Sequence, residues 1–124
     1  MDKVIKFTAE DAKALAPTVS DMELRVLAET YADALVRRRN CWVEVMMSRY
    51  RQMERIGLAY SHMAYSGNPR RFDRTIVEVF TDTSRREVKV GLACCAPSDA
   101  FDLHYGTAIA FARAMGEKVP IDLF

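Results

Sequence analysis

The sequence predicts an α+β fold: N-terminal helices arranged as a helical hairpin, then an antiparallel β-hairpin and a C-terminal helix, assembled as an oligomer. Helical spacing of apolar residues dominates the first half of the chain, and alternation of apolar with polar residues replaces it afterwards. A chain of 124 residues is long enough to bury one core. We therefore expect a single domain, mainly helical over 1–66, with the β-hairpin and helix in 74–116.

Three helices are expected in the first part. A short helix over 9–16 should end before Pro17, because the residue preceding a proline is disfavoured in helical geometry. A longer helix is predicted over 21–38, and Asn40 is read as a cap or break before a third helix over 41–64. That third helix carries an apolar stripe at heptad-like spacing, which needs a partner helix from the same chain or from another subunit. The stripe consists of Trp42, Met46, Met53, Ile56, Tyr60 and Met63.

The β-hairpin is predicted from two segments rich in β-branched residues, 75–81 and 86–92, which flank a short loop at 82–85. Two strands alone are marginally stable in water. The hairpin therefore needs the helices, a third strand at 4–7, or the hairpin of another subunit.

The last helix should begin after an Asp102 cap and run to about Met115, with Gly116 as a left-handed stop. Gly106 and Ala110 leave a bare stripe on one face of this helix, with Arg113 beside it. Such a stripe lets another backbone or a flat ligand come close.

Charge and hydropathy exclude several classes of protein. With 18 basic and 17 acidic residues the net charge is +1, which argues against a strongly basic nucleic-acid-binding domain. Basic residues concentrate in 37–55 and 70–89, which predicts either an electropositive surface for phosphates or acidic partners, or simply a solvated face. No apolar run approaches the roughly 20 residues that span a bilayer, so we expect a cytosolic protein without a membrane partner.

Nothing in the sequence assigns catalysis. His62 and His104 lie in different predicted elements, without a serine or cysteine beside either in a nucleophile-and-base pattern. Cys41, Cys94 and Cys95 lack the spacing of a zinc site, so we expect them to be buried small hydrophobes. The prediction is no enzyme, no catalytic residue, no metal and no cofactor.

A set of recognition residues remains in the second half. Phe80 and Phe101 could stack on a purine ring, or could simply pack in the core. Arg86, Lys89 and Arg113 could hold phosphates, or could be ordinary surface charges. Together with the bare surface at Gly106, these residues form the predicted ligand-binding set.

The second half also resembles a known family. A valine-rich strand, a Cys-x-Pro-x-Asp-x-Phe-Asp turn and a Gly-x-Ala-Ile-Ala-x-x-Arg-Ala helix are similar to small phage proteins of the Thoeris anti-defence sponge type. The matching residues are Val88, Val90, Cys95, Pro97, Asp99, Phe101, Asp102, Gly106, Ala108, Ile109, Ala110, Arg113 and Ala114.

The resemblance implies a non-enzymatic homo-oligomer in the host cytoplasm that sequesters a cyclic nucleotide-type immune signal, such as a cyclic ADP-ribose isomer. It implies that Arg113 contacts this ligand. Two alternatives stay open. The chain could be a phage inhibitor that binds a host protein complex, either a CRISPR effector, which is a host defence protein, or RNA polymerase. It could also be a nucleic-acid-binding module.

Overall fold

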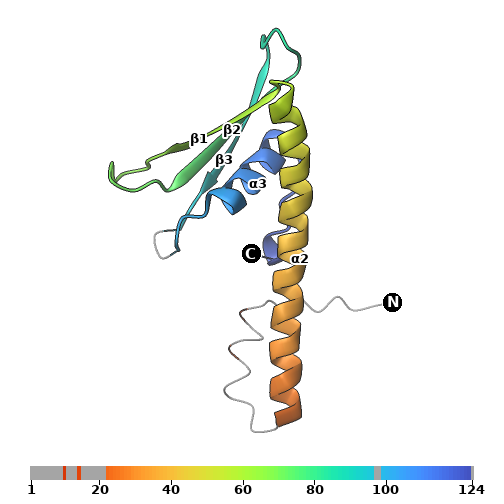
Figure 1. Ribbon diagram of the computed structural model, residues 1–124. Coiled ribbons are helices and arrows are strands. Elements are labelled where there is room, and N and C mark those ends of the chain that lie inside the picture. The colour runs from red at the N-terminus through yellow and green to blue at the C-terminus, as the bar shows by residue number, and fades with distance from the viewer. Residues whose placement is uncertain (1–9, 11–13, 15–21, 97–98, 124) are drawn as a thin grey trace. The chain divides into compact units, whose positions relative to one another are not determined.

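The computed structural model describes residues 10, 14, 22–96 and 99–123 (Figure 1). It is an α+β structure with a long N-terminal helix, a three-stranded antiparallel sheet and a C-terminal helix. The expected strand at 4–7 lies outside the described residues, as does most of the expected helix at 9–16. The chain divides into two compact units, and the second unit, Val43–Val119, contains the whole sheet.

Helix α2 is continuous over Met22–Arg55, so the expected break at Asn40 and the helical hairpin are wrong. One asparagine costs a helix only a fraction of a kcal/mol, about 0.7 at most, and arginine, a good helix former, occupies positions 37–39 before it. The helix ends because Gly57 adopts a left-handed φ of 77°, while Leu58 N–H donates to the Met53 carbonyl. This is the geometry of a glycine stop.

Residues 59–64, expected to continue the helix, instead form strand β1, Ala59–Ala64. Strand β1 pairs antiparallel with β2, Arg74–Phe80, which pairs antiparallel with β3, Val88–Cys94. The predicted hairpin is therefore confirmed within two residues at each end, but it is part of a sheet with the order β1-β2-β3. Beyond the glycine stop, an extended segment that can pair with β2 satisfies more backbone groups than an isolated helical turn.

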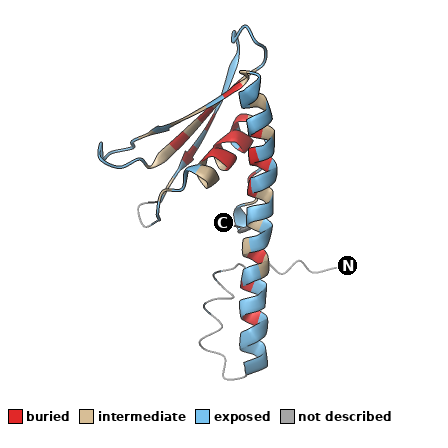
Figure 2. Ribbon diagram, viewed as in Figure 1, coloured by how far each residue is buried: buried red, intermediate tan, exposed pale blue. Residues whose placement is uncertain are grey.

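Helix α3, Leu103–Ala114, begins and ends as predicted. The Asp102 side chain accepts hydrogen bonds from the backbone N–H groups of His104 and Tyr105, and Gly116 has a left-handed φ of 73°. Helix α3 packs on β2 and β3 and is buried over most of its length (Figure 2). We call the sheet surface under α3 the inner face.

The two close contacts of α3 with the sheet are made at glycines. A Cβ on Gly91 of β3 would lie 1.7 Å from the Ala110 carbonyl oxygen and 2.6 Å from the Ala114 nitrogen. A Cβ on Gly106 of α3 would lie 2.4 Å from the Thr75 hydroxyl oxygen, and Thr75 is fully buried. The Thr75 side chain at Gly106 and the β3 backbone at Ala110 therefore fill the bare stripe that the sequence placed there.

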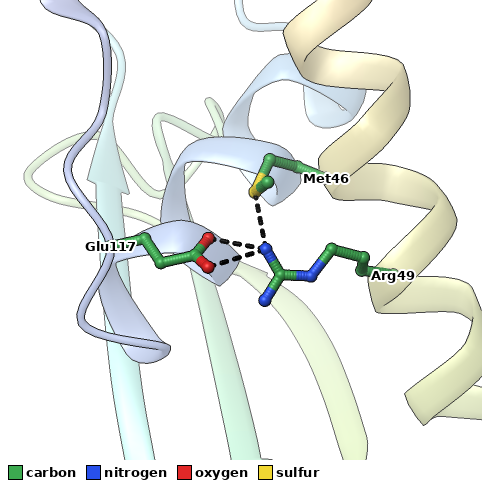
Figure 3. A network of polar contacts seen from close by, with 3 residues as sticks. All are labelled: Met46, Arg49 and Glu117. Carbon is green, nitrogen blue, oxygen red and sulfur yellow. Dashed lines mark hydrogen bonds and ion pairs between the residues drawn. The ribbon is translucent and has the colours of Figure 1, made fainter.

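The C-terminal part of α2 adds the remaining cover of this unit. The Tyr50 ring meets the Phe111 ring edge to face, with centroids 5.8 Å apart. Arg49 donates to both carboxylate oxygens of Glu117 at 2.7 Å, and the Met46 sulfur lies 3.9 Å from the same nitrogen (Figure 3). The predicted heptad stripe is divided between elements: Met46 is buried here, whereas Tyr60 lies on β1.

The contact at Gly91 predicts a large penalty for a single methyl group. Gly91→Ala should lower the free energy of unfolding by about 3 kcal/mol, because α3 must move away from β3 to accept the Cβ. Gly67→Ala is the control, since nothing lies within 4 Å of its built Cβ. Urea denaturation of the two variants measures the difference, and equal stabilities would contradict the close packing.

Tyr50 predicts a loss of stability at high pH. Burial, followed by a hydrogen bond to the Glu54 carboxylate, raises the pKa of Tyr50 from 10.0 to about 12. The pKa of Tyr50 is higher in the folded state than in the unfolded state. Its contribution to the free energy of unfolding is therefore complete below pH 10 and is lost as the pH rises through about 12. Two pKa units correspond to about 3 kcal/mol.

Tyr50→Phe should therefore remove part of the alkaline destabilisation, while the exposed Tyr60→Phe should not. Unfolding free energies between pH 9 and about 12, with ultraviolet titration of the tyrosines, would show this difference. A wild-type spectrum in which every tyrosine ionises near its ordinary pKa would contradict it.

Candidate functional site

The surface that remains open for binding in the second unit is the sheet surface away from α3. Side chains alternate between the faces of a strand, and the buried β2 residues Thr75, Val77 and Val79 define the inner face. We call the opposite surface the outer face. It consists of Tyr60, His62, Ala64, Arg74, Ile76, Glu78, Phe80, Val88, Val90, Leu92 and Cys94.

The outer face is mostly apolar and aromatic, and much of it is exposed. Tyr60 is 55% exposed, Val90 is 56% exposed and Leu92 is 40% exposed. The Tyr60 and His62 rings stack with centroids 5.7 Å apart. Exposed aromatic groups on a sheet are a common platform for flat ligands.

One end of the outer face combines an aromatic ring with cations. The Arg85 guanidinium lies over the Phe80 ring, 5.1 Å from its centroid, in a cation–π contact. The loop between β2 and β3 places Arg85 there, and Arg85 has a left-handed φ of 57°. Arg86 follows in the same loop and is exposed. We call Phe80, Arg85 and Arg86 the loop-end cluster.

The six predicted ligand residues do not gather at one place. Phe80 and Lys89 lie one register step apart on neighbouring strands but belong to opposite faces by alternation. Gly106 contacts Thr75, which is five residues from Phe80 along β2, or about 17 Å at 3.4 Å per residue. Phe101 is half-buried just before α3. Only Phe80 and Arg86 share the loop-end cluster.

Arg113 has a partner within the chain. Its guanidinium donates a hydrogen bond of 2.7 Å to the backbone carbonyl of Leu92. Leu92 lies on the edge strand β3, between Gly91 and Ala93, whose register partners are Val77 and Thr75. Backbone groups of successive residues point to opposite sides of a strand, so the Leu92 carbonyl points away from β2 when those of Gly91 and Ala93 point towards it. Arg113 therefore donates to a carbonyl oxygen on the free edge of the sheet.

The histidines and cysteines show no catalytic arrangement among the described residues. His104 Nε2 lies 2.7 Å from a Glu44 carboxylate oxygen, and His62 stacks on Tyr60. Cys41 and Cys94 are exposed, so the expectation that the cysteines are buried is wrong for both. No group of three potential metal-ligating side chains occurs in the described part of the chain.

The sequence analysis did not identify Tyr60 and His62 as residues of the outer face, or Arg85 as a residue of the loop-end cluster. The signal for the first two was Gly57, since a glycine stop after Arg55 frees 59–64 to be extended. The position of Arg85 over Phe80 depends on the loop conformation and had no local signal.

Comparisons of the chain with protein families, with curated proteins and with solved structures gave no match. None of the described helices combines the length and apolar composition needed to cross a membrane. The functional interpretation of the candidate site therefore rests on the geometry of the site and on the resemblance noted in the sequence.

The Arg113 contact predicts a structural role that can be measured. Arg113→Ala should lower the free energy of unfolding by about 1 kcal/mol, because the Leu92 carbonyl loses its hydrogen bond. Lys118→Ala, which removes another exposed basic side chain, serves as the control. Thermal and urea unfolding would reveal the loss, and identical stability of Arg113→Ala and wild type would argue against it.

Proposed function

We propose that the chain is a non-enzymatic binding protein that captures a phosphorylated purine compound at the loop-end cluster. The observation that carries this proposal is the Arg85 guanidinium over the half-buried Phe80 ring, and the next residue in the loop, Arg86, is an exposed second cation. Aromatic rings and guanidinium planes stack on nucleobases. Arginine also binds phosphate oxygens through its planar fork.

The biological role proposed for this binding is phage counter-defence in the host cytoplasm. It is supported by the resemblance of the strand, turn and helix between Val88 and Ala114 to anti-defence sponges. The ligand would then be a cyclic nucleotide-type signal such as a cyclic ADP-ribose isomer, bound and withheld from its effector. No chemical step is needed for this role.

The proposed binding place differs from the groove between the hairpin and α3 that the bare stripe suggested. Gly91 and Gly106 bring backbone and side chain into contact there, which leaves no room for a purine ring. Arg113 is exposed at the edge of this contact and donates to Leu92. We therefore assign phosphate binding to Arg85 and Arg86 rather than to Arg113.

A second candidate function is inhibition of a host protein complex, such as a CRISPR effector or RNA polymerase. The exposed apolar side chains Val88, Val90 and Leu92 favour it, because they extend along β3 beyond the area that one nucleotide covers. Large exposed apolar patches are typical of protein interaction sites. Failure to bind any nucleotide would favour this candidate.

Calorimetric titration with a cyclic ADP-ribose isomer, ADP-ribose and AMP tests the proposal. Phe80→Ala should weaken binding by about 1 to 3 kcal/mol, the range for stacking of one base on an aromatic ring. Arg86→Ala should weaken it by a similar amount, with less effect on AMP, which has one phosphate. Phe72→Ala, an aromatic residue 39% exposed outside β2, is the matched control.

Heating the complex should release the ligand unaltered, because the proposed role includes no chemical step. Recovery of a cleaved product would contradict the non-enzymatic assignment. Binding that survives both Phe80→Ala and Arg86→Ala would contradict the proposed site.

A further inference from the structure

We propose that the outer face binds the outer face of a second copy of this chain, related by a twofold axis that passes close to Ile76. Three rows of the face run across all three strands in register, and a fourth row, Phe80 and Val88, spans β2 and β3. Tyr60, Glu78 and Val90 form one row, and the next row carries Ile76 at its centre. The twofold axis would lie between the two sheets, perpendicular to β2.

The composition of the outer face supports burial against another surface. Eight of its eleven residues are apolar or aromatic, and Val88, Val90 and Tyr60 are each close to half exposed. An antiparallel sheet that faces water normally alternates apolar inner residues with polar outer ones. Strand β3 does not follow this rule, because Val88, Val90 and Leu92 all point outward.

The charges on the outer face are self-complementary. Arg74 and Glu78 are its two formally charged residues, and they lie two positions on either side of Ile76 along β2. Their register partners carry no charge: Ala64 and Cys94 flank Arg74, while Tyr60 and Val90 flank Glu78. A twofold axis at Ile76 reverses the strand direction and places Arg74 of one copy opposite Glu78 of the other, twice.

This symmetry is the reason for choosing a second copy as the occupant. A twofold interface uses the same patch on both chains, so the patch must complement itself. Opposite charges at equal distances from an apolar centre meet that condition. The two sheets would stack about 10 Å apart, the usual spacing of packed sheets.

The size of the face sets the expected strength. The face is roughly 20 Å long along the strands, from a rise of about 3.4 Å per residue. It is roughly 10 to 15 Å wide across the strands, from a strand spacing of about 4.8 Å. That is less than the roughly 800 Å² per partner of a standard interface. We therefore expect a weak, concentration-dependent dimer.

This inference does not depend on the proposed nucleotide site. Phe80 is four residues from Ile76 along β2, about 13 Å at 3.4 Å per residue, and so lies at the rim of the interface. Loss of nucleotide binding in Arg86→Ala would leave the dimer intact, because Arg86 is in the loop outside the face.

Sedimentation equilibrium of the charge variants tests the interface. Arg74→Glu and Glu78→Arg should each weaken self-association at least tenfold, because each brings like charges together. An equimolar mixture of the two variants should form a heterodimer, since one chain then carries two acidic residues and the other two basic residues at these positions. Recovery of the dimer on mixing would show that neither variant had lost self-association through misfolding.

Val90→Lys provides a second disruption on the exposed edge strand, where folding is least affected, and Ile56→Glu is the control at a residue 63% exposed outside the face. The proposal predicts loss of the dimer in Val90→Lys and its retention in Ile56→Glu. A wild-type protein that stays monomeric at about 1 mM would overturn it. So would charge variants that dimerise like wild type, or a mixture that stays monomeric.

Discussion

The contact of α3 with β3 at Gly91 is the constraint on which the rest of the second unit depends. The Ala110 carbonyl and the Ala114 nitrogen occupy the space that any side chain at position 91 would need. This approach lets small residues fill the layer between helix and sheet, and Ala108, Ala110 and Ala112 are fully buried. The close contact at Gly91 leaves no room for a purine ring between α3 and β3, and the proposed ligand site is therefore on the other surface of the sheet.

The two roles proposed for the outer face are compatible with that closed inner face. An aromatic ring under a guanidinium at the loop end suits a purine and its phosphates, whereas the apolar rows towards the centre suit a second protein surface. The proposed ligand site and the proposed dimer interface would thus occupy neighbouring parts of one sheet. Arg113 meanwhile protects the free edge of β3 by satisfying the Leu92 carbonyl.

The sequence predicted best where the signals were local. Asp102 and Gly116 mark the ends of α3 within one turn of the helix itself, and β-branched runs mark β2 and β3. Strand β1 was missed because heptad-like spacing through Tyr60 outweighed the glycine stop at Gly57. Spacing counts apolar residues but not the backbone geometry that a single glycine can impose.

The candidate site was less predictable because its geometry depends on contacts between distant residues. Alternation along the strands separates Lys89 from Phe80, and this could have been derived from the sequence. The partner of Arg113 could not, since Leu92 is 21 residues away and meets it only through the packing of α3 on the sheet.

Nuclear Overhauser spectroscopy of the labelled protein tests the central claim, that α3 closes the inner face, most directly. The account predicts cross-peaks from the Gly91 Hα protons to protons of Ala110 and Ala114, and from Gly106 to the Thr75 side chain. Gly91 without cross-peaks to α3, or with cross-peaks to water instead, would show an open inner face and contradict the account.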